Sequence, residues 1–304
     1  MPPPSTQPDP SEILRQVRRI ELRTRRLVNS RFSGDYHSIF KGQGIEFAEV
    51  REYQPGDDVR SIDWNVTARL GRPYLKRYVE ERELTVLLAV DMSGSQRWGT
   101  RGRLKSTMIA EVAATLAMSA MHNNDRVGLL IFTDAVEAFV PPAKGRRHAL
   151  RLVRDLLAFE PERRGTDLGG GLDYATRLLR SRSVIFLFSD FQLGDGSSAF
   201  ERVLRQAGAR HDVVAVHTED VGDQVLPRAG LLRLTDPESG ESIAVDTSKG
   251  DTRAKHVRRT ELERERVVRI FRSIGVDEIR LRTDLPYASA LLSFFRRRER
   301  RARR

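Results

Sequence analysis

The chain has 304 residues, of which 39% are hydrophobic and 31% are charged, a composition typical of folded globular domains rather than of disordered chains. No run of about 18 apolar residues occurs, so we expect no transmembrane segment. The proline-rich start, residues 1–10, lacks the apolar core of a signal peptide and is expected to be a disordered tail. The absence of cysteine excludes disulfides, thiolate zinc sites and thiol nucleophiles, and it favours a cytoplasmic location.

The formal net charge of +11 is concentrated near the two ends of the chain. Residues 11–31 carry seven arginines against two glutamates, residues 296–304 carry seven arginines against one glutamate, and these segments account for the whole excess. Such ends can bind nucleic acid or another acidic surface, but no aromatic residues interleave with the arginines, as base stacking would require. We therefore expect a solvated helix and a basic tail, with no specific nucleic-acid partner. Nucleic-acid or acidic-surface binding is the alternative.

The first 83 residues indicate a helix followed by a small unit. Apolar residues recur at roughly helical spacing over residues 11–29. Residues 34–83 contain the turn signals "KGQG" and "QPGDD", in which the Pro-Gly pair suits a type II turn. One of the two aspartates that follow, Asp57 or Asp58, is expected to cap a short helix through "VRSIDW". We therefore assign residues 11–83 to an N-terminal helix and a small subdomain.

From residue 84 onward, strands alternate with helices, which predicts a mostly parallel sheet with helices on both faces. The runs "LTVLLAV" and "SVIFLFSD" are continuously apolar, as in strands that are buried on both faces. The other expected strands are "RVGLLIF", "AVEAFV", "HDVVAVHT" and "VDEIRLRT", and the expected helices include residues 103–122, 252–274 and "LPYASALLSFF". The predicted fold class is thus α/β, a doubly wound sheet over residues 84–295 with a β-hairpin insertion at 230–247.

Small oxygen-bearing side chains follow the two most apolar strands of this predicted sheet. Asp91 ends the first of them, Ser93 and Ser95 follow on the next loop, and Asp190 ends the second. Thr166 lies on a third loop just before a helix. In open parallel sheets, ligands bind outside the carboxyl ends of the strands, and hard oxygen ligands with few charges suit Mg²⁺. The pattern therefore predicts a magnesium site, with Mn²⁺ or Ca²⁺ as substitutes, although each of these residues alone is also a common cap.

The order Asp-x-Ser-x-Ser, then Thr, then Asp resembles the metal-ion-dependent adhesion site of von Willebrand factor A domains. The resemblance covers about residues 84–222 and implies a von Willebrand A-like fold. In that family the hydroxyls coordinate the metal directly, which would apply here to Ser93, Ser95 and Thr166, while the aspartates, here Asp91 and Asp190, act mostly through water. It also implies that a carboxylate from a partner protein completes the metal shell.

A second resemblance lies upstream, in "GIEFAEVREYQPGDDVRSIDWNVTAR", residues 44–69, in "KRYVEERELTV" and in the final "FFRRR". These segments are similar to the bacterial family of domain of unknown function 58, which joins this signature to a von Willebrand A-like domain. Genes of that family often lie beside those of MoxR-type AAA+ ATPases, which implies an adaptor or co-chaperone role. The many charges of the signature form either a partner-binding face or an ion-pair network, and the network is the simpler expectation because unpaired buried charges are costly.

Motifs for enzymatic chemistry are incomplete. The stretch "GTRGRLKST" has Leu104 where a phosphate-binding loop needs glycine before the lysine. Phosphatases that form a phospho-aspartate have a second acid two residues after the nucleophilic aspartate, and here Ser93 occupies that position after Asp91. Neither G-x-S-x-G nor H-E-x-x-H occurs. The glycines at 169–171 are expected to allow a close helix N-terminus. We therefore expect no enzymatic activity, with a magnesium-dependent hydrolase as a less favoured alternative.

The preferred interpretation is a metal-dependent protein-interaction module. Its expected partner is a MoxR-type AAA+ ATPase or the protein client of that ATPase. Trp98 and Phe191 lie on the loops that follow the two strands and are the candidate aromatic anchors of the interface, unless they pack inward.

Overall fold

The computed structural model describes residues 10–28, 36, 46–79, 83–100 and 103–302. The chain divides into two units, which are described separately: the smaller is Phe40–Leu84, and the larger combines Met1–Ile39 with Thr85–Arg304. Within the described ranges, no helix is both long enough and apolar enough to cross a membrane. Nearly all of the expected N-terminal tail lies outside the described residues.

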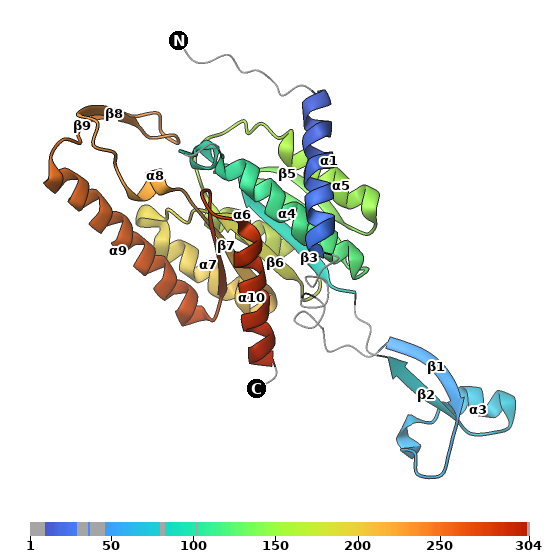
Figure 1. Ribbon diagram of the computed structural model, residues 1–304. Helices are drawn as coiled ribbons and strands as arrows, with labels where there is room; N and C mark the ends of the chain where they lie inside the picture. The colour runs from blue at the N-terminus through green and yellow to red at the C-terminus, as the bar shows by residue number, and fades with distance from the viewer. Residues whose placement is uncertain (1–9, 29–35, 37–45, 80–82, 101–102, 303–304) are drawn as a thin grey trace. The chain divides into compact units, whose positions relative to one another are not determined.

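A six-stranded sheet forms the centre of the larger unit, in the order β10-β7-β6-β3-β4-β5 (Figure 1). All neighbouring strands are parallel except β4 and β5, which are antiparallel. The strands are β3 (Thr85–Asp91), β4 (Arg126–Phe132), β5 (Val136–Ala143), β6 (Val184–Ser189), β7 (Asp212–Glu219) and β10 (Asp277–Arg282). The predicted α/β fold with a mostly parallel sheet is confirmed.

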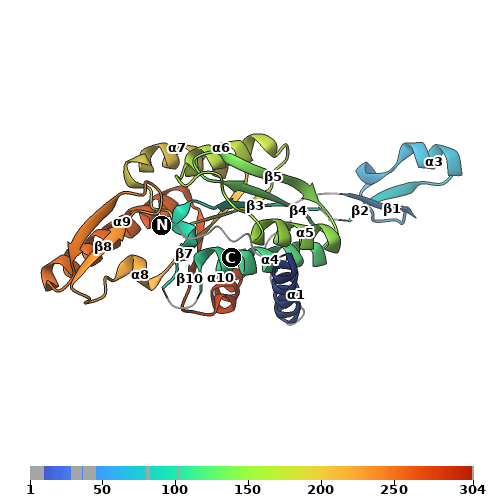
Figure 2. The ribbon, with the colours of Figure 1, turned by 90° about the horizontal axis from the view of Figure 1, so that it is seen from above.

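Helices cover both faces of this sheet, as the continuous apolar runs of β3 and β6 require (Figure 2). One face carries α6 (Leu168–Leu178), α7 (Ser197–Arg210) and α9 (Gly250–Ile274), whose apolar residues share a core cluster with Leu87 and Ala89 of β3. The other face carries α4 (Lys105–His122), α5 (Arg146–Leu157), α1 (Pro10–Leu27) and α10 (Tyr287–Ala302).

The N-terminal helix belongs to the larger unit, which differs from its expected grouping within residues 11–83. Val17 and Ile20 of α1 are buried against Ala114 of α4 and Val153 of α5. The helix is amphipathic, so its apolar stripe needs a partner surface, and α4 and α5 supply one. The N-terminal helix is therefore packed within the larger unit.

The prediction of a basic tail at 296–304 is wrong for residues 296–302, because α10 continues to Ala302. The side chain of Arg298 is only 14% exposed and forms ion pairs of 2.6 Å with both Asp212 and Asp277. Arg301 also pairs with Asp277, at 2.7 Å. Carboxylates at the starts of β7 and β10 thus hold the helix, and these arginines are not a free cationic tail.

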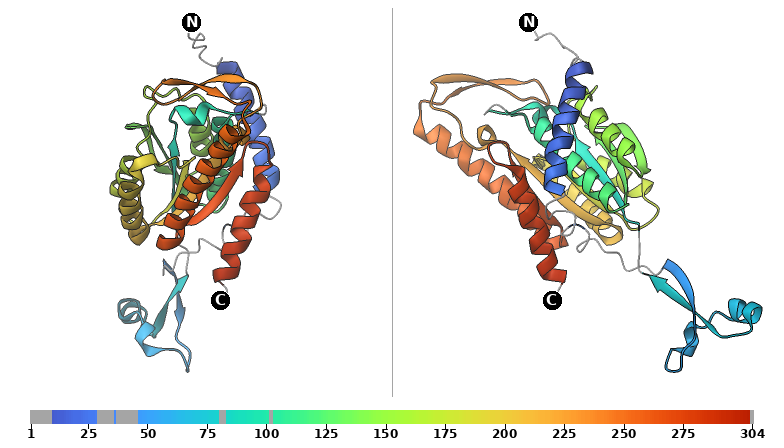
Figure 3. Two further views of the ribbon diagram at one scale, coloured as in Figure 1. Left: turned by 90° about the vertical axis from the view of Figure 1, so that its left-hand side faces the viewer. Right: turned by 45° about the vertical axis from the view of Figure 1, so that its right-hand side comes forward.

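The predicted hairpin is confirmed as β8 (Leu231–Thr235) and β9 (Ser242–Asp246), which pair in antiparallel fashion. A short helix, α8 (Val221–Gln224), precedes it and was not predicted. Figures 1 and 3 show the hairpin reaching over the end of the sheet at which β3 terminates.

The smaller unit is a two-stranded antiparallel ribbon, β1 (Glu46–Glu52) and β2 (Tyr74–Val79), with α3 (Trp64–Leu70) between the strands. The predicted helix through "VRSIDW" is a 3₁₀ turn capped by Asp58, and a separate cap at Asp63 starts α3. Arg51 pairs with Asp57 at 2.6 Å, as the ion-pair interpretation of the signature expects.

Candidate metal centre

The five predicted site residues come from the end of the sheet at which its topology reverses. From β3 the sheet grows to β4 on one side and to β6 on the other, so crossover connections leave in opposite directions. Ligand sites of open α/β sheets lie at such a switch point, outside the carboxyl ends of the strands. Val90 pairs with Phe188, which brings the next residues, Asp91 and Ser189, side by side at this edge.

Asp91 is completely buried and held from two sides. One carboxylate oxygen accepts the backbone N–H of Ser93 at 2.9 Å, and the other accepts the hydroxyl of Ser189 at 2.7 Å. Burial, followed by the nearby charge of Asp190, raises the pKa of Asp91 from 3.8 to about 7. A cation beside Asp91 would favour its charged form, so the electrostatics of the site suit a positive ligand.

The two serine hydroxyls of the motif face each other on the loop after β3. Their Oγ atoms lie 3.2 Å apart, and both residues are buried. Gly94, between them, donates its N–H to the carbonyl of Arg164 at 2.9 Å, which ties this loop to the segment that carries Thr166. Backbone contacts therefore bring the hydroxyl groups of Ser93, Ser95 and Thr166, the predicted direct metal ligands, to the same end of the sheet.

Asp190 is engaged by a buried lysine that the sequence analysis did not include in the site. The ammonium of Lys105, at the start of α4, lies 3.0 Å from Asp190 and 2.7 Å from Asp223, and the lysine side chain is fully buried. Burial alone would lower the pKa of Lys105, but the two carboxylates raise it above its ordinary value. The lysine therefore stays charged and compensates part of the acidic charge at the site.

Glu238, at the tip of the β8–β9 hairpin, is a second residue that the sequence analysis missed. Its carboxylate accepts the hydroxyl of Thr166 at 2.7 Å. Burial raises the pKa of Glu238, the hydroxyl of Thr166 lowers it in part, and the nearby charge of Asp190 raises it further. Nothing in its sequence context, a Pro-Glu-Ser-Gly turn, distinguishes this glutamate from an ordinary exposed turn residue.

The donor chemistry fits a hard divalent cation. Two carboxylates and three hydroxyls gather at the site, all of them oxygen ligands of the kind that Mg²⁺ prefers. No cluster of three or more His, Cys, Asp or Glu side chains placed to hold a metal occurs among the described residues. The candidate centre is thus rich in hydroxyls rather than in acids, and a bound metal stays a prediction on the five residues Asp91, Ser93, Ser95, Thr166 and Asp190.

The two aromatic residues at the rim have different environments. Phe191 is buried, and its ring packs against Phe200, Phe271 and His217, so it packs inward, which was the alternative to a role as a partner anchor. Its backbone has a left-handed φ of 51°, uncommon for a bulky residue and often found where a loop positions a site. Trp98, in contrast, is 51% exposed and stays a candidate anchor.

The glycines in the first turn of α6, residues 169–171, allow a close helix start, as predicted. Asp167 caps the helix by accepting the N–H of Gly170 at 2.8 Å. A methyl group on Gly171 would lie 2.6 Å from the ring of Phe132, at the end of β4. The absence of a side chain at Gly171 therefore allows α6 to pack closely against the sheet.

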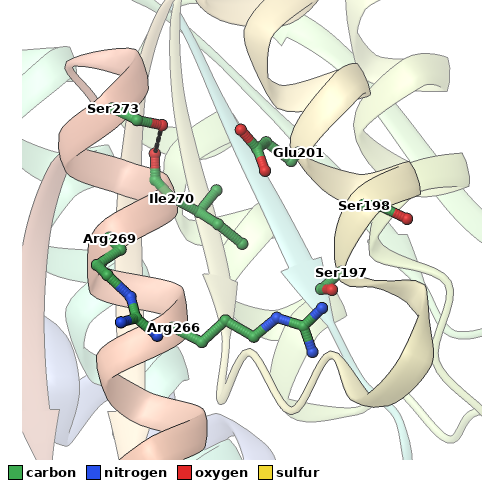
Figure 4. Close-up of a pocket in the computed structure, with 7 residues that line it drawn as sticks. All are labelled: Ser197, Ser198, Glu201, Arg266, Arg269, Ile270 and Ser273. Carbon is green, nitrogen blue, oxygen red and sulfur yellow. Dashed lines mark hydrogen bonds between the residues drawn. The ribbon is translucent and has the colours of Figure 1, made fainter.

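A separate pocket of about 280 Å³ lies between α7 and α9 (Figure 4). Figure 4 shows the guanidinium of Arg266 directed toward Ser197, with Glu201 across the pocket on α7. Its lining residues are Ser197, Ser198, Glu201, Arg266, Arg269, Ile270 and Ser273. None of the five predicted metal ligands lines this pocket.

Comparisons with known proteins give a family and several distant structural neighbours. The family model described as "Protein of unknown function DUF58" matches residues 49–266. The uncharacterized protein Rv1480 of Mycobacterium tuberculosis is 33% identical over 298 residues, which are 97% of this chain and 92% of that protein. The uncharacterized protein MAV169 of Mycobacterium avium is 31% identical over 167 residues, 53% of this chain and 95% of that protein.

Among solved structures, the conserved hypothetical protein BatB of Bacteroides thetaiotaomicron shares 15% identity at a TM-score of 0.48, over 73% of this chain and 100% of that one. The SpRpn10 VWA domain shares 12% identity at a TM-score of 0.39, over 69% of this chain and 93% of that one. These scores are low, so the family assignment rests on the sequence matches. Since the family model spans well over half of the chain and Rv1480 matches nearly all of it, the chain belongs to the DUF58 family of proteins of unknown function.

Proposed function

We propose that this chain is a metal-dependent protein-interaction module, in which Mg²⁺ at the switch point of the sheet binds a carboxylate of a partner protein. The observation that carries the proposal is the arrangement around Asp91: a buried acid, two facing serine hydroxyls and a second acid at the carboxyl ends of adjacent strands. The residues that would hold the ion are Asp91, Ser93, Ser95, Thr166 and Asp190.

The neutral hydroxyls decide what such an ion would do. When bound, it supplies a positive centre that attracts a further oxygen ligand. Ser93, Ser95 and Thr166 would coordinate it without cancelling its charge, while Asp91 and Asp190 hold it electrostatically. Lys105 already compensates part of the charge of Asp190, so the ion keeps an unmet preference for an anionic oxygen, and a partner's carboxylate meets that preference.

The surface around the site would supply most of the affinity, because one carboxylate–metal contact covers little area. Trp98 is half exposed on the loop that follows the motif, and large aromatic side chains contribute strongly when they fill a partner's pocket. The proposed partner is a MoxR-type AAA+ ATPase or its client, as the family resemblance implies. The arginines of α10 are a weaker basis for binding nucleic acid, since Arg298 and Arg301 are paired with acids of the sheet.

Titration with Mn²⁺ as the probe, followed calorimetrically, tests the metal site. We expect one site in the wild-type chain, a binding loss of tenfold or more in Ser93→Ala, and no change in Ser198→Ala, which removes an exposed hydroxyl on α7. Equal affinity in Ser93→Ala and wild type would contradict the assignment.

Copurification with the AAA+ ATPase, in magnesium and in chelator, tests the role of the metal in partner binding. The complex should be lost in chelator and weakened by Trp98→Ala, while moderate salt should matter less. A complex that survives chelator but dissociates in raised salt would instead indicate binding through charged surfaces.

A further inference from the structure

The tip of the β8–β9 hairpin is a preformed turn. The carboxylate of Asp236 accepts the N–H of Glu238 at 2.9 Å and the hydroxyl of Ser239 at 2.8 Å. Backbone bonds between Asp236 and Glu241 and between Gly240 and Asp236 close the turn, and Gly240 has the positive φ of 76° that this geometry requires. The conformation of the tip is thus set by its own residues.

Glu238 is directed from this tip toward the candidate metal centre. It is half-buried, whereas its neighbours Pro237 and Ser239 are exposed. Its carboxylate accepts the hydroxyl of Thr166 at 2.7 Å, and Thr166 is one of the proposed metal ligands. A hydroxyl can offer its oxygen to a cation while it donates its proton to a carboxylate, so this bond is compatible with a metal at the site.

Gly94 allows the tip to approach so closely. A methyl group at this position would overlap the carbonyl oxygen of Pro237 and lie 2.7 Å from its carbonyl carbon. Any larger residue between Ser93 and Ser95 would therefore push the hairpin away from the motif loop. The small residue is needed here for close approach of another backbone rather than for a positive φ.

The hairpin itself buries little apolar surface. Leu231 is 73% exposed and Ile243 is 63% exposed, and most other residues of its two strands are also exposed or half-exposed. Because hydrophobic stabilisation follows the area removed from water, little opposes a movement of the tip. Its contacts at Thr166 and Gly94 are therefore contacts that a competitor can replace.

We infer that Glu238 is an internal ligand of the metal centre, which occupies the position that a partner's carboxylate takes when it binds. This inference rests on the proposed function and adds its regulation: the chain carries its own competitor, and a partner must displace the hairpin tip. Exchange of one carboxylate for another leaves the charge of the site unchanged, so the surface around the site decides which of the two is bound.

The test uses Mn²⁺ and acetate as probes on the full chain. We expect Glu238→Ala to bind Mn²⁺ about tenfold more weakly than wild type, because the site loses a charged ligand. At saturating Mn²⁺, the same variant should bind acetate more tightly than wild type, as measured by water-proton relaxation. The matched control, Glu241→Ala, removes an exposed acid of the same turn and should change neither affinity.

The two affinities are expected to change in opposite directions, which a merely structural role would not produce. A second variant, Gly94→Ala, keeps Asp91, Ser93, Ser95, Thr166 and Asp190 unchanged but excludes the tip that carries Glu238, and it should behave like Glu238→Ala. If wild type binds Mn²⁺ and either variant matches it in both affinities, the inference is overturned and the proposed function stands. If the wild-type chain does not bind Mn²⁺, both are overturned.

Discussion

Replacement of Asp91 by asparagine should stabilise the metal-free protein at neutral to alkaline pH. The folded state raises the pKa of this acid from 3.8 to about 7, chiefly through burial and then through the charge of Asp190. Below the lower value the acid is protonated in both folded and unfolded states. Between the two values only the unfolded state ionises, so stability is lost progressively as the pH rises and reaches its full deficit above about 7.

The size of the deficit follows from the two pKa values. Their difference corresponds to about 4 kcal/mol, an upper limit for a buried acid with a charged neighbour. Asparagine keeps the shape of the side chain: its oxygen can accept the N–H of Ser93, and its amide can donate to Ser189 in place of the present bond. The substitution therefore removes the buried charge without opening a cavity.

Urea denaturation in chelator, at a series of pH values, measures the effect. Asp91→Asn should be more stable than wild type above about pH 7, and the difference should vanish toward pH 4. Saturating Mg²⁺ should stabilise wild type by about 3 kcal/mol at a hundredfold excess over its dissociation constant, and it should not stabilise the variant. Asp251→Asn, at an exposed acid of α9 whose ion pair with Lys255 lies at the surface, is the control and should change stability far less than Asp91→Asn does. A variant that is no more stable than wild type at high pH would refute the reasoning.

Two further substitutions test the surroundings of the site by the same denaturation assay. Lys105→Met should destabilise the protein in chelator by about 3–5 kcal/mol, because it leaves buried carboxylates without their cation, and Mg²⁺ should recover part of the loss. The exposed control Lys255→Met should have no measurable effect. A loss of stability for Lys105→Met no greater than for this control would contradict the account. Gly171→Ala should destabilise by about 1–3 kcal/mol, because its methyl group would meet the ring of Phe132; unchanged stability would show that α6 can move away from the sheet.

The sheet and the order of its elements could be predicted because the information is local. An apolar run such as residues 85–91 reports burial on both faces within one strand, and regular alternation with helices implies parallel neighbours. The five candidate ligand residues could be picked out for the same reason, since each follows a recognisable strand or precedes a helix. The hairpin was visible from its turn residues.

What the sequence did not reveal depends on contacts between distant segments. The periodicity of α1 shows an apolar stripe but not that α4 and α5 cover it. The arginine-rich end of α10 looked like a tail because the pairing of Arg298 with Asp212 and Asp277 links residues far apart in the chain. Phe191 looked like a rim residue because nothing in the neighbouring sequence indicates its positive φ. With this backbone conformation, its ring lies in the core.

The charge balance of the candidate centre includes three residues that the sequence analysis did not place at the site, Lys105, Asp223 and Glu238, and it bears on the proposed chemistry. Lys105 pairs with Asp190 and Asp223, and the charge of Asp190 acts on Asp91 and Glu238, so these five side chains carry a formal charge of −3 when all four acids are ionised. A monovalent ion would leave this buried group strongly anionic, whereas a divalent ion brings it to −1, which surrounding hydroxyls and backbone N–H groups can stabilise. If Glu238 is the internal ligand that we infer, its loss without replacement would bring the group to neutrality, whereas its exchange for a partner's carboxylate would keep the charge at −1. Exchange of one carboxylate for another therefore leaves the charge balance of the proposed site unchanged.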